Sequence, residues 1–169
     1  MAKVVVSSYC SAWPEVFGGV RGELLEVFAP LTVGIEHIGS TAVPGLAAKP
    51  VIDVLLGAGS LEAIEGRIGG LEAVGYAYVS KYEAELPMRR YFVKAPAEGL
   101  RIHVHGVVRG GRLWREHLAF REALRADEDL RARYQELKLR LAREFADDKA
   151  AYTEAKGPFI EAVLERGAL

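Results

Sequence analysis

The stretch of residues 36–56, EHIGSTAVPGLAAKPVIDVLL, decides how the whole chain is interpreted. Its first residues are typical of a β-strand that breaks into a turn at Gly39 and Ser40. Its last residues, after Lys49, form a second apolar strand with one carboxylate, Asp53, in the middle. A carboxylate buried alone costs several kcal/mol or loses its charge, so we expect Asp53 to be paired or used in chemistry.

The flanking sequence predicts strands before Gly110 and helices after it. A helix is expected from about residue 14 to 30, because apolar residues recur every three or four positions there. Strands are expected over residues 32–38, 51–56, 76–82, 89–94 and 100–108, with one helix between 60 and 73. Three further helical elements are expected over 114–124, 130–145 and 147–166, the last of them interrupted at Gly157 and Pro158, where a separate helix could begin. This order predicts one α+β or mixed α/β domain over 1–169, with a strand-rich core at about 32–108 and C-terminal helices at about 113–166.

The composition excludes several classes of protein. The 22 lysines and arginines balance 23 acidic residues, so no basic field exists to hold nucleic acid in bulk. The single cysteine, Cys10, fits a reducing cytoplasm because it cannot form an internal disulfide. No run approaches eighteen apolar residues and the start lacks a signal-peptide pattern. We therefore expect a cytoplasmic protein without a membrane span.

Two short motifs could carry chemistry. Gly39, Ser40 and Thr41 follow a strand directly, and their backbone amides with the Ser40 hydroxyl could hold a phosphate; the alternative is an ordinary turn. In RIHVHGV, residues 101–107, His103 and His105 are two positions apart and so share one strand face. That face could present both imidazoles to a metal or a phosphate, or could simply be a half-exposed surface that happens to hold histidines.

Asp53 is the natural partner of this histidine pair. It is either a metal ligand or base in a cleft, or an aspartate at a strand end bonded to backbone amides. His37, on the preceding strand, is a further candidate metal ligand. In the helical half, tyrosine is interleaved with lysine, which could hold a polyphosphate or stack on a base, although most charge runs are only solvated faces. The expected phosphate- or nucleotide-binding set is Gly39, Ser40, Thr41, Lys49, Arg121, Tyr134, Lys138, Tyr152 and Lys156.

Together these stretches resemble the GrpB family. The carriers are HIGSTAVPGLAAKPVIDVLL at 37–56, HVH at 103–105, HLAFREALRADEDLRARYQELKLRLA at 117–142 and AYTEAKGPFIEAVL at 151–164, with YCSAWPEVF at 9–17 matching the family's usual start. The family is similar to the polymerase-beta-type nucleotidyltransferases, whose fold is a small mixed sheet with helices on one side. Related domains are fused to dephospho-CoA kinase in some bacteria.

The resemblance implies a site that departs from the nucleotidyltransferase pattern at two of its three acids. There a Gly-Ser turn holds the triphosphate, the next strand carries two carboxylates two positions apart, a later strand adds a third, and two Mg²⁺ ions bind between them. Gly39 and Ser40 match the turn and Asp53 matches the first acid, but Leu55 stands at the second. His103 or His105 stands near the third.

This departure changes the expected metal. Imidazole suits Zn²⁺ or Mn²⁺ better than Mg²⁺, which prefers oxygen. We therefore expect any bound ion to be single, to touch Asp53 with His103 or His105, and to be Mn²⁺ or Zn²⁺ rather than Mg²⁺. A missing oxygen could come from one of three other acids: Glu36, Glu83 or Glu85.

Three functions follow, and the first is favoured narrowly. The chain could transfer a nucleotidyl or phosphoryl group to a small acceptor. It could instead be a non-catalytic module that binds a nucleotide or phosphometabolite and serves coenzyme A metabolism. Finally, it could be a metal-dependent hydrolase that uses Asp53 with His37, His103 and His105. Each requires the strands that carry these residues to be neighbours in one sheet.

Overall fold

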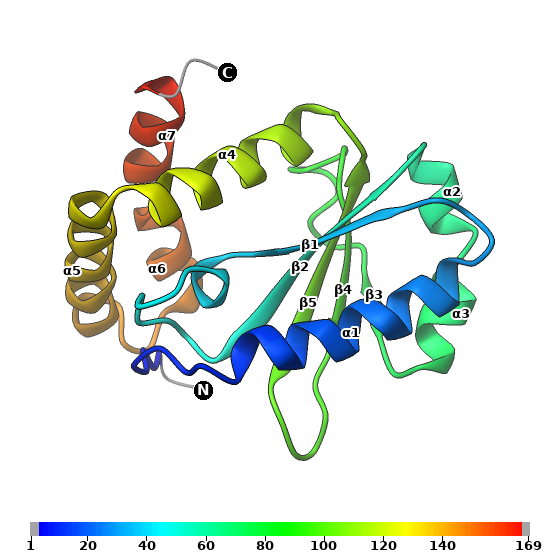
Figure 1. Cartoon of the computed structure of the whole chain (residues 1–169), viewed down its shortest axis with the longest axis horizontal. Coiled ribbons are helices and arrows are strands. Elements are labelled where there is room, and N and C mark those ends of the chain that lie inside the picture. The colour runs from blue at the N-terminus through cyan, green and yellow to red at the C-terminus, as the bar shows by residue number, and fades with distance from the viewer. Residues whose placement is uncertain (1–3, 167–169) are drawn as a thin grey trace.

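The computed structural model describes residues 4–166 and contains one five-stranded mixed sheet with helices on both faces (Figure 1). The strands lie in the order β1 (Gly34–Ile38), β2 (Val51–Ala58), β5 (Arg101–Val108), β4 (Arg90–Lys94) and β3 (Ala77–Val79). β2 and β5 run parallel, and the other pairs are antiparallel. The predicted mixed α/β class is confirmed, and the strands that carry His37, Asp53, His103 and His105 are neighbours as expected.

The helices follow the predicted order with one difference. The long helix is α1 (Trp13–Phe28), and the C-terminal half contains α4 (Arg112–Ala126), α5 (Glu128–Glu144), α6 (Lys149–Ala155) and α7 (Gly157–Arg166). The single helix predicted over 60–73 is wrong: two short helices, α2 (Leu61–Glu65) and α3 (Ile68–Ala73), replace it. Ser60 caps α2 by accepting a 3.1 Å hydrogen bond from the Ala63 amide, but Gly66 ends that helix after five residues.

One face of the sheet packs against α1, α2 and α3. Alternate residues of β2, among them Ile52 and Val54, point to this face because strand side chains alternate. They meet Leu24 and Phe28 of α1 and Leu71 of α3, all fully buried. This is the main hydrophobic core.

The other face carries Asp53 and is only partly covered. α4 lays Trp114 and Leu118 against Leu55 of β2 and Val107 of β5. Gly57 is needed beneath this helix, because a Cβ there would lie 2.7 Å from the Trp114 ring. α4 thus seals the part of the face beside Leu55, which is fully buried, and leaves the part around Asp53 accessible.

The C-terminal helices pack on the loop that follows β1. Leu124 of α4, with Leu130 and Tyr134 of α5, buries Val43 and Leu46 of that loop. Asp127 caps α5 by accepting a 3.0 Å hydrogen bond from the Leu130 amide. This packing brings α5 and α7 against the loop that follows the Gly39–Ser40 turn, far along the chain from either helix.

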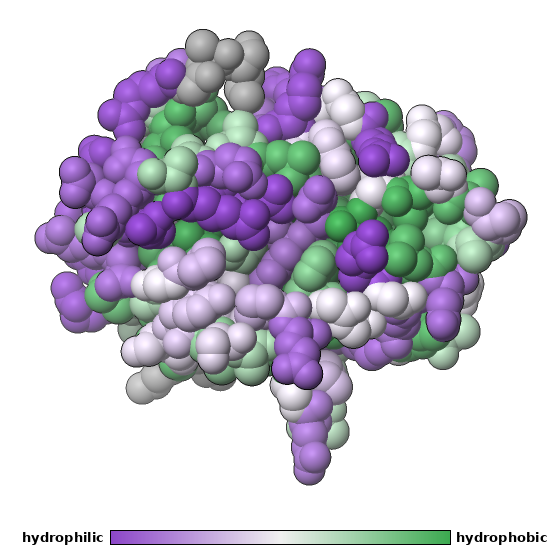
Figure 2. All heavy atoms as spheres, in the orientation of Figure 1, coloured by the Kyte–Doolittle hydropathy of each residue, from purple (hydrophilic) through white to green (hydrophobic). Residues whose placement is uncertain are grey.

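The exposed surface differs between the two ends of the molecule. Figure 2 shows hydrophilic side chains over α4 and α5, whereas apolar side chains gather at the end near α2 and α3. Within residues 4–166, no helix combines the length and the apolar character needed to cross a membrane.

Candidate functional site

Asp53 lies in the middle of β2 and touches both histidines of β5. Its side chain is 28% exposed, and its Oδ1 atom lies 3.1 Å from His105 Nε2 and 3.8 Å from His103 Nδ1. The parallel register places Asp53 opposite His103 and Leu55 opposite His105. The predicted grouping of these three residues is therefore what the structure contains.

Hydrogen bonds fix the tautomer of His105. Arg89 Nη1 lies 3.2 Å from His105 Nδ1, and a guanidinium can only donate, so Nδ1 must carry the lone pair. The ring proton is then on Nε2, which donates to Asp53. Arg101 Nε donates in the same way to His103 Nε2 at 3.4 Å, which leaves the His103 proton on Nδ1, facing Asp53. Both imidazoles offer Asp53 an N–H rather than a lone pair.

Asp53 is an ionised carboxylate. Burial opposes its charge, but the hydrogen bond from His105 and the nearby His105, His103 and Lys156 outweigh that effect and hold the pKa of Asp53 below its usual value. Burial also lowers the pKa of His103 to about 4, so His103 is neutral at physiological pH. The site thus contains one anion surrounded by donors.

Gly39 places the turn directly against this carboxylate. Its φ of +75° favours glycine, and a Cβ at this position would lie 2.6 Å from Asp53 Oδ2. The short 3₁₀ helix η1 (Ser40–Ala42) follows, closed by a hydrogen bond from the Ala42 amide to the Gly39 carbonyl. In the described chain the amides of Gly39, Ser40 and Thr41 donate to no other residue. These amides are available to a ligand.

His37 and the Thr41 side chain do not belong to this site. The Thr41 hydroxyl donates to the Val51 carbonyl at 3.0 Å and accepts from His37 Nε2 at 2.9 Å. His37 pairs with Val54 in the register, so it points to the α1 face, where it stacks on Phe17 with ring centroids 4.8 Å apart. Burial lowers its pKa to about 4. The predicted contribution of His37 to a metal site is wrong because adjacent strand residues point to opposite faces.

Three lysines from distant parts of the chain converge beside the turn. Lys138 of α5 is 2% exposed, donates to the Ala47 carbonyl and lies 5.2 Å from the Tyr134 ring centroid. Lys49 and Lys156 lie 5.3 and 4.8 Å from the centroid of Tyr152. Among residues 4–166, no carboxylate comes within ion-pairing distance of any of the three.

These lysines are held in an environment that disfavours their own charge. Burial, with the charges of Lys156 and Lys49, lowers the pKa of Lys138 to about 7. Burial and Lys49 lower the pKa of Lys156 to about 8, although Asp53 opposes the shift. The pKa of Lys49 is also lowered by burial, again opposed by Asp53. We refer to Lys49, Lys138 and Lys156 as the lysine cluster.

The two tyrosines hold the lysines and have no free ring face for a base. Tyr134 is 4% exposed, stacks on Phe159 at 5.2 Å and meets Phe120 edge-on at 5.3 Å. Burial raises its pKa, and the Ser40 hydroxyl beside it opposes part of that shift. Tyr152 is 1% exposed. The predicted stacking of either ring on a base is not supported, because both rings are core.

Arg121 is also committed elsewhere. It donates to Glu36 Oε2 and to the His37 carbonyl, both at 3.0 Å, and so ties α4 to β1. Glu36 is thereby paired and does not approach Asp53 as a spare ligand. Glu83 bonds Tyr78 near β3, and Glu85 lines a separate groove. None of the three acids joins the Asp53 group.

Two residues near the site were not singled out from sequence. His117 of α4 has its ring 5.8 Å from that of His105, and burial lowers its pKa to about 4. Arg89, before β4, lies 4.5 Å from the Tyr91 ring centroid. No spacing pattern links either residue to Asp53 or to the histidine pair, because each belongs to a different element of the fold.

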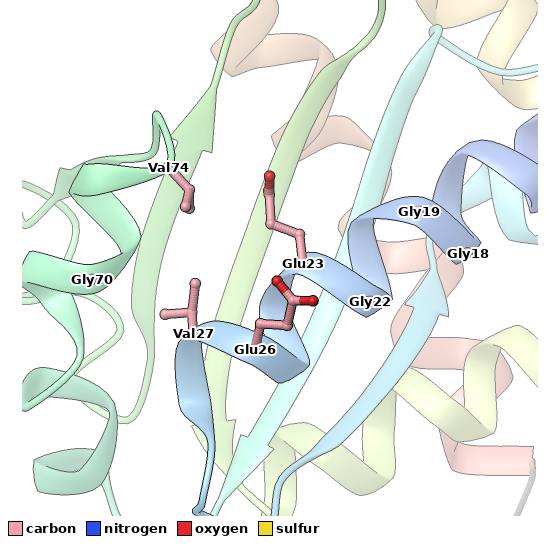
Figure 3. Close-up of a pocket in the computed structure, with 8 residues that line it drawn as sticks. All are labelled: Gly18, Gly19, Gly22, Glu23, Glu26, Val27, Gly70 and Val74. Atoms are coloured by element: carbon pink, nitrogen blue, oxygen red, sulfur yellow. The ribbon is translucent and has the colours of Figure 1, made fainter.

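Two hollows lie away from these residues. One, of about 630 Å³, lies between the α1 glycines, Gly18, Gly19 and Gly22, and the α3 side, where Gly70 and Val74 line it (Figure 3). The other, of about 310 Å³, lies between residues 85–88 and the start of α4. Neither is lined by Asp53, the turn or the lysine cluster.

The residues present do not fit a divalent-metal centre. Within residues 4–166, no group of three His, Cys, Asp or Glu side chains is arranged to hold an ion. His103 and His105 turn N–H groups toward Asp53, and a metal needs lone pairs. Leu55, at the position expected for a second acid, is buried under α4. The predicted Asp53–histidine metal site is therefore not preformed.

Relatives align in sequence with most of this chain. A UPF0157 protein of Streptomyces coelicolor is 35% identical over 164 residues, covering 97% of this chain and 84% of that protein. The dephospho-CoA kinase of Mycolicibacterium paratuberculosis is 30% identical over 177 residues, covering 91% of this chain and 43% of the enzyme.

Solved structures agree with this relationship. GrpB from Enterococcus faecalis has a TM-score of 0.86 at 34% identity, with 96% of each chain covered. The Cid1 poly(U) polymerase, in a structure with Mg and 3'-dATP bound, has a TM-score of 0.54 at 11% identity, covering 83% of this chain and 43% of the polymerase. That likeness shows a nucleotidyltransferase-like fold and nothing more. A family model described as GrpB protein matches residues 3–166, and the chain is a member of the GrpB family.

Proposed function

We propose that this protein binds a nucleotide or another phosphorylated small molecule between the Gly39–Ser40 turn and the lysine cluster, and that it transfers a nucleotidyl or phosphoryl group. The observation that carries the proposal is the lysine cluster itself. Three lysines, one of them 2% exposed, gather in the described structure with no carboxylate paired to them. Cations that repel one another in a partly buried site are a cost to folding, which a bound polyanion would relieve.

The turn supplies the second half of the phosphate site. The free amides of Ser40 and Thr41 are neutral donors, and the Ser40 hydroxyl adds one more. A phosphate in this position would receive hydrogen bonds from the backbone on one side and positive charge on the other. Gly39 allows this by letting the backbone run against Asp53 without a side chain.

Transfer would use the ionised Asp53 beside the turn. An acceptor hydroxyl would form a new P–O bond, its proton would pass to the carboxylate, and the bond to the leaving group would break, which releases diphosphate in nucleotidyl transfer and the nucleoside diphosphate in phosphoryl transfer. Asp53 Oδ2, on the side of Gly39, is the oxygen left for this role, because Oδ1 accepts from His105.

A second candidate is a binding module without catalysis that serves coenzyme A metabolism. Two observations favour it: the second acid of the nucleotidyltransferase pattern is a buried leucine, and a dephospho-CoA kinase contains a similar region. The metal-dependent hydrolase is disfavoured because His37 lies on the other face of the sheet.

Calorimetric titration tests the binding site. ATP, CTP, GTP, UTP, dephospho-CoA and tripolyphosphate would be titrated into the wild type, Lys49→Ala and Lys156→Ala. Each lysine removed should weaken binding about tenfold or more, since a charge-assisted hydrogen bond contributes about 1.5–3 kcal/mol. Arg140→Met, an exposed position on α5, is the matched control and should bind as the wild type does. If no phosphate compound binds, or if the lysine variants bind equally well, the proposal fails.

The two candidates separate on product formation. Incubating each bound nucleotide with small hydroxyl acceptors, and following diphosphate release for nucleotidyl transfer and nucleoside diphosphate formation for phosphoryl transfer, would detect the reaction. Release that is lost in Asp53→Asn supports the enzyme. Tight binding without release, unchanged in Asp53→Asn, supports the module.

A further inference from the structure

Around Asp53 the side chains are hydrogen-bond donors and lysines, so positive charge for a phosphate is already present in the protein. We infer that this protein holds its phosphate ligand without a divalent metal: the lysine cluster neutralises the phosphates, and Arg89, acting through His105, keeps Asp53 a hydrogen-bonded carboxylate rather than a metal ligand. This deepens the proposed function, because it names metal-free phosphate compounds as the ligand class, and it rests on that function.

The first step is the direction of the hydrogen bonds. Arg89 donates to His105 Nδ1 at 3.2 Å, so His105 must donate from Nε2 to Asp53 Oδ1 at 3.1 Å. To become a ligand shared with Asp53, His105 would have to move its proton to Nδ1, where it would face the guanidinium. That would replace two hydrogen bonds with a donor–donor clash.

Arg89 is well held for this positioning role. Its guanidinium lies 4.5 Å from the Tyr91 ring centroid and 6.0 Å from that of Tyr82. In residues 4–166 no carboxylate pairs with it, so no acid competes with His105 for its protons. An arginine stacked on aromatic rings keeps a fixed orientation and cannot give up its proton.

The second step is the balance of charge. Asp53 is close enough to Lys49 and Lys156 for its charge to raise their pKa values. Arg101 and Lys49 are likewise close enough to His103 for their charges to lower its pKa. A divalent cation bound at Asp53 would add two positive charges to a site that already has these cations and one carboxylate. Like charges at such distances repel, and more strongly where burial removes water.

The third step is the sealed position of the missing acid. Leu55 is fully buried against Trp114 and Leu118 of α4, so no water-filled space beside it could admit a carboxylate or the hydrated ion it would bind. Mg²⁺ retains several waters and needs oxygen ligands in octahedral geometry. The cations required for a polyphosphate are instead supplied by side chains.

Two measurements test this inference on the whole protein. First, tripolyphosphate and ATP are titrated calorimetrically in EDTA and in excess Mg²⁺. We expect dissociation constants in EDTA equal to or lower than those in Mg²⁺, because Mg²⁺ removes negative charge that the lysines would otherwise bind. Binding more than tenfold tighter in Mg²⁺ would overturn the inference.

Second, ¹⁵N NMR of histidine-labelled protein reads the tautomers directly. His105 should carry its proton on Nε2, and its nitrogen signals should not move when one equivalent of Mg²⁺, Mn²⁺ or Zn²⁺ is added. Arg89→Met should give a mixture of tautomers, and Arg89→Lys should restore the Nε2–H form. A proton on Nδ1 in the wild type, or a stoichiometric shift of His105 by a metal, would overturn the inference.

The two arms separate this inference from the proposed function. If no phosphate compound binds under either condition, the proposed function fails, and the histidine spectra still decide whether Asp53 is hydrogen-bonded by His105 or available to a metal.

Discussion

Replacing Lys138 by methionine should make the free protein more stable at neutral pH while weakening phosphate binding. Lys138 is 2% exposed, and its pKa falls from 10.5 to about 7 through burial and the charges of Lys156 and Lys49. Methionine is unbranched, fits the same space and has no charge to bury. The substitution therefore removes a folding cost that the ligand would otherwise relieve.

The size of the effect follows from proton linkage. Between pH 7 and 9 the unfolded chain keeps the Lys138 proton, whereas the folded chain has mostly released it. Because the folded pKa lies below the unfolded one, stability rises with pH across this window, by up to about 1.4 kcal/mol per pH unit and about 2 kcal/mol in all. In Lys138→Met this contribution is absent. At pH 7 the variant should be more stable by about 1–3 kcal/mol, after subtracting about 1 kcal/mol for the lost hydrogen bond to Ala47.

Urea denaturation and thermal melts at pH 7, 8 and 9 measure this. For a chain of 169 residues, 1 kcal/mol corresponds to about 2–4 °C in Tm. The gap between variant and wild type should shrink as pH rises, and Arg140→Met should show no such gap. The reasoning is refuted if Lys138→Met is less stable than the wild type at pH 7, or if the gap is the same at all three pH values.

Four further outcomes are expected. Gly39→Ala should lower the free energy of unfolding by about 1 kcal/mol because of the positive φ, and by more because of the clash with Asp53. Gly45→Ala, with φ +83° and open space around it, should lose only the contribution from φ. Equal losses in urea denaturation would show that there is no clash. Ser40→Ala should weaken tripolyphosphate binding about 2- to 10-fold in calorimetry with an unchanged Tm, and a large fall in Tm would mean that Ser40 is structural. Phosphate affinity should fall from pH 7 to 9, because Lys138 and Lys156, with pKa values of about 7 and 8, lose their charge; affinity that rises with pH would contradict the lysine cluster's role. Arg121→Met should destabilise the fold by about 1–3 kcal/mol, because its hydrogen bonds to Glu36 and the His37 carbonyl are lost, and phosphate affinity should be unaffected. A loss of phosphate affinity without a loss of stability would show that Arg121 binds the phosphate.

Sequence patterns predicted the fold well because strong local signals matched the final packing. The apolar run around Asp53 is typical of a strand covered on both sides, and β2 is an interior strand, paired with β1 on one side and β5 on the other. The two-residue spacing of His103 and His105 placed both on Asp53's face. The 60–73 helix was wrong because the chain breaks at Gly66 and Arg67, between α2 and α3, where glycine weakens helical continuity more than the apolar spacing suggests.

The arrangement of the site was harder to predict, because it depends on contacts between distant elements. His37 was assigned to the wrong face because alternation along a strand does not say which face is which. The lysine cluster combines a loop residue with residues of α5 and the end of α6. Only the packing of those helices on the 39–49 loop brings them together. The tautomers of the histidines depend on Arg89 and Arg101, whose contacts no spacing rule predicts.

The position of α4 over Leu55 bears on how this scaffold could be redesigned. Introducing an aspartate at Leu55 to recreate a pair of acids would place a charge beneath Trp114 and Leu118, where burial without a partner costs several kcal/mol. A single substitution would therefore give an unstable protein or a protonated, inert acid. Converting this chain into a two-metal enzyme therefore requires α4 to take a different path. The position of that helix, more than the identity of residue 55, prevents a second carboxylate from binding a metal here.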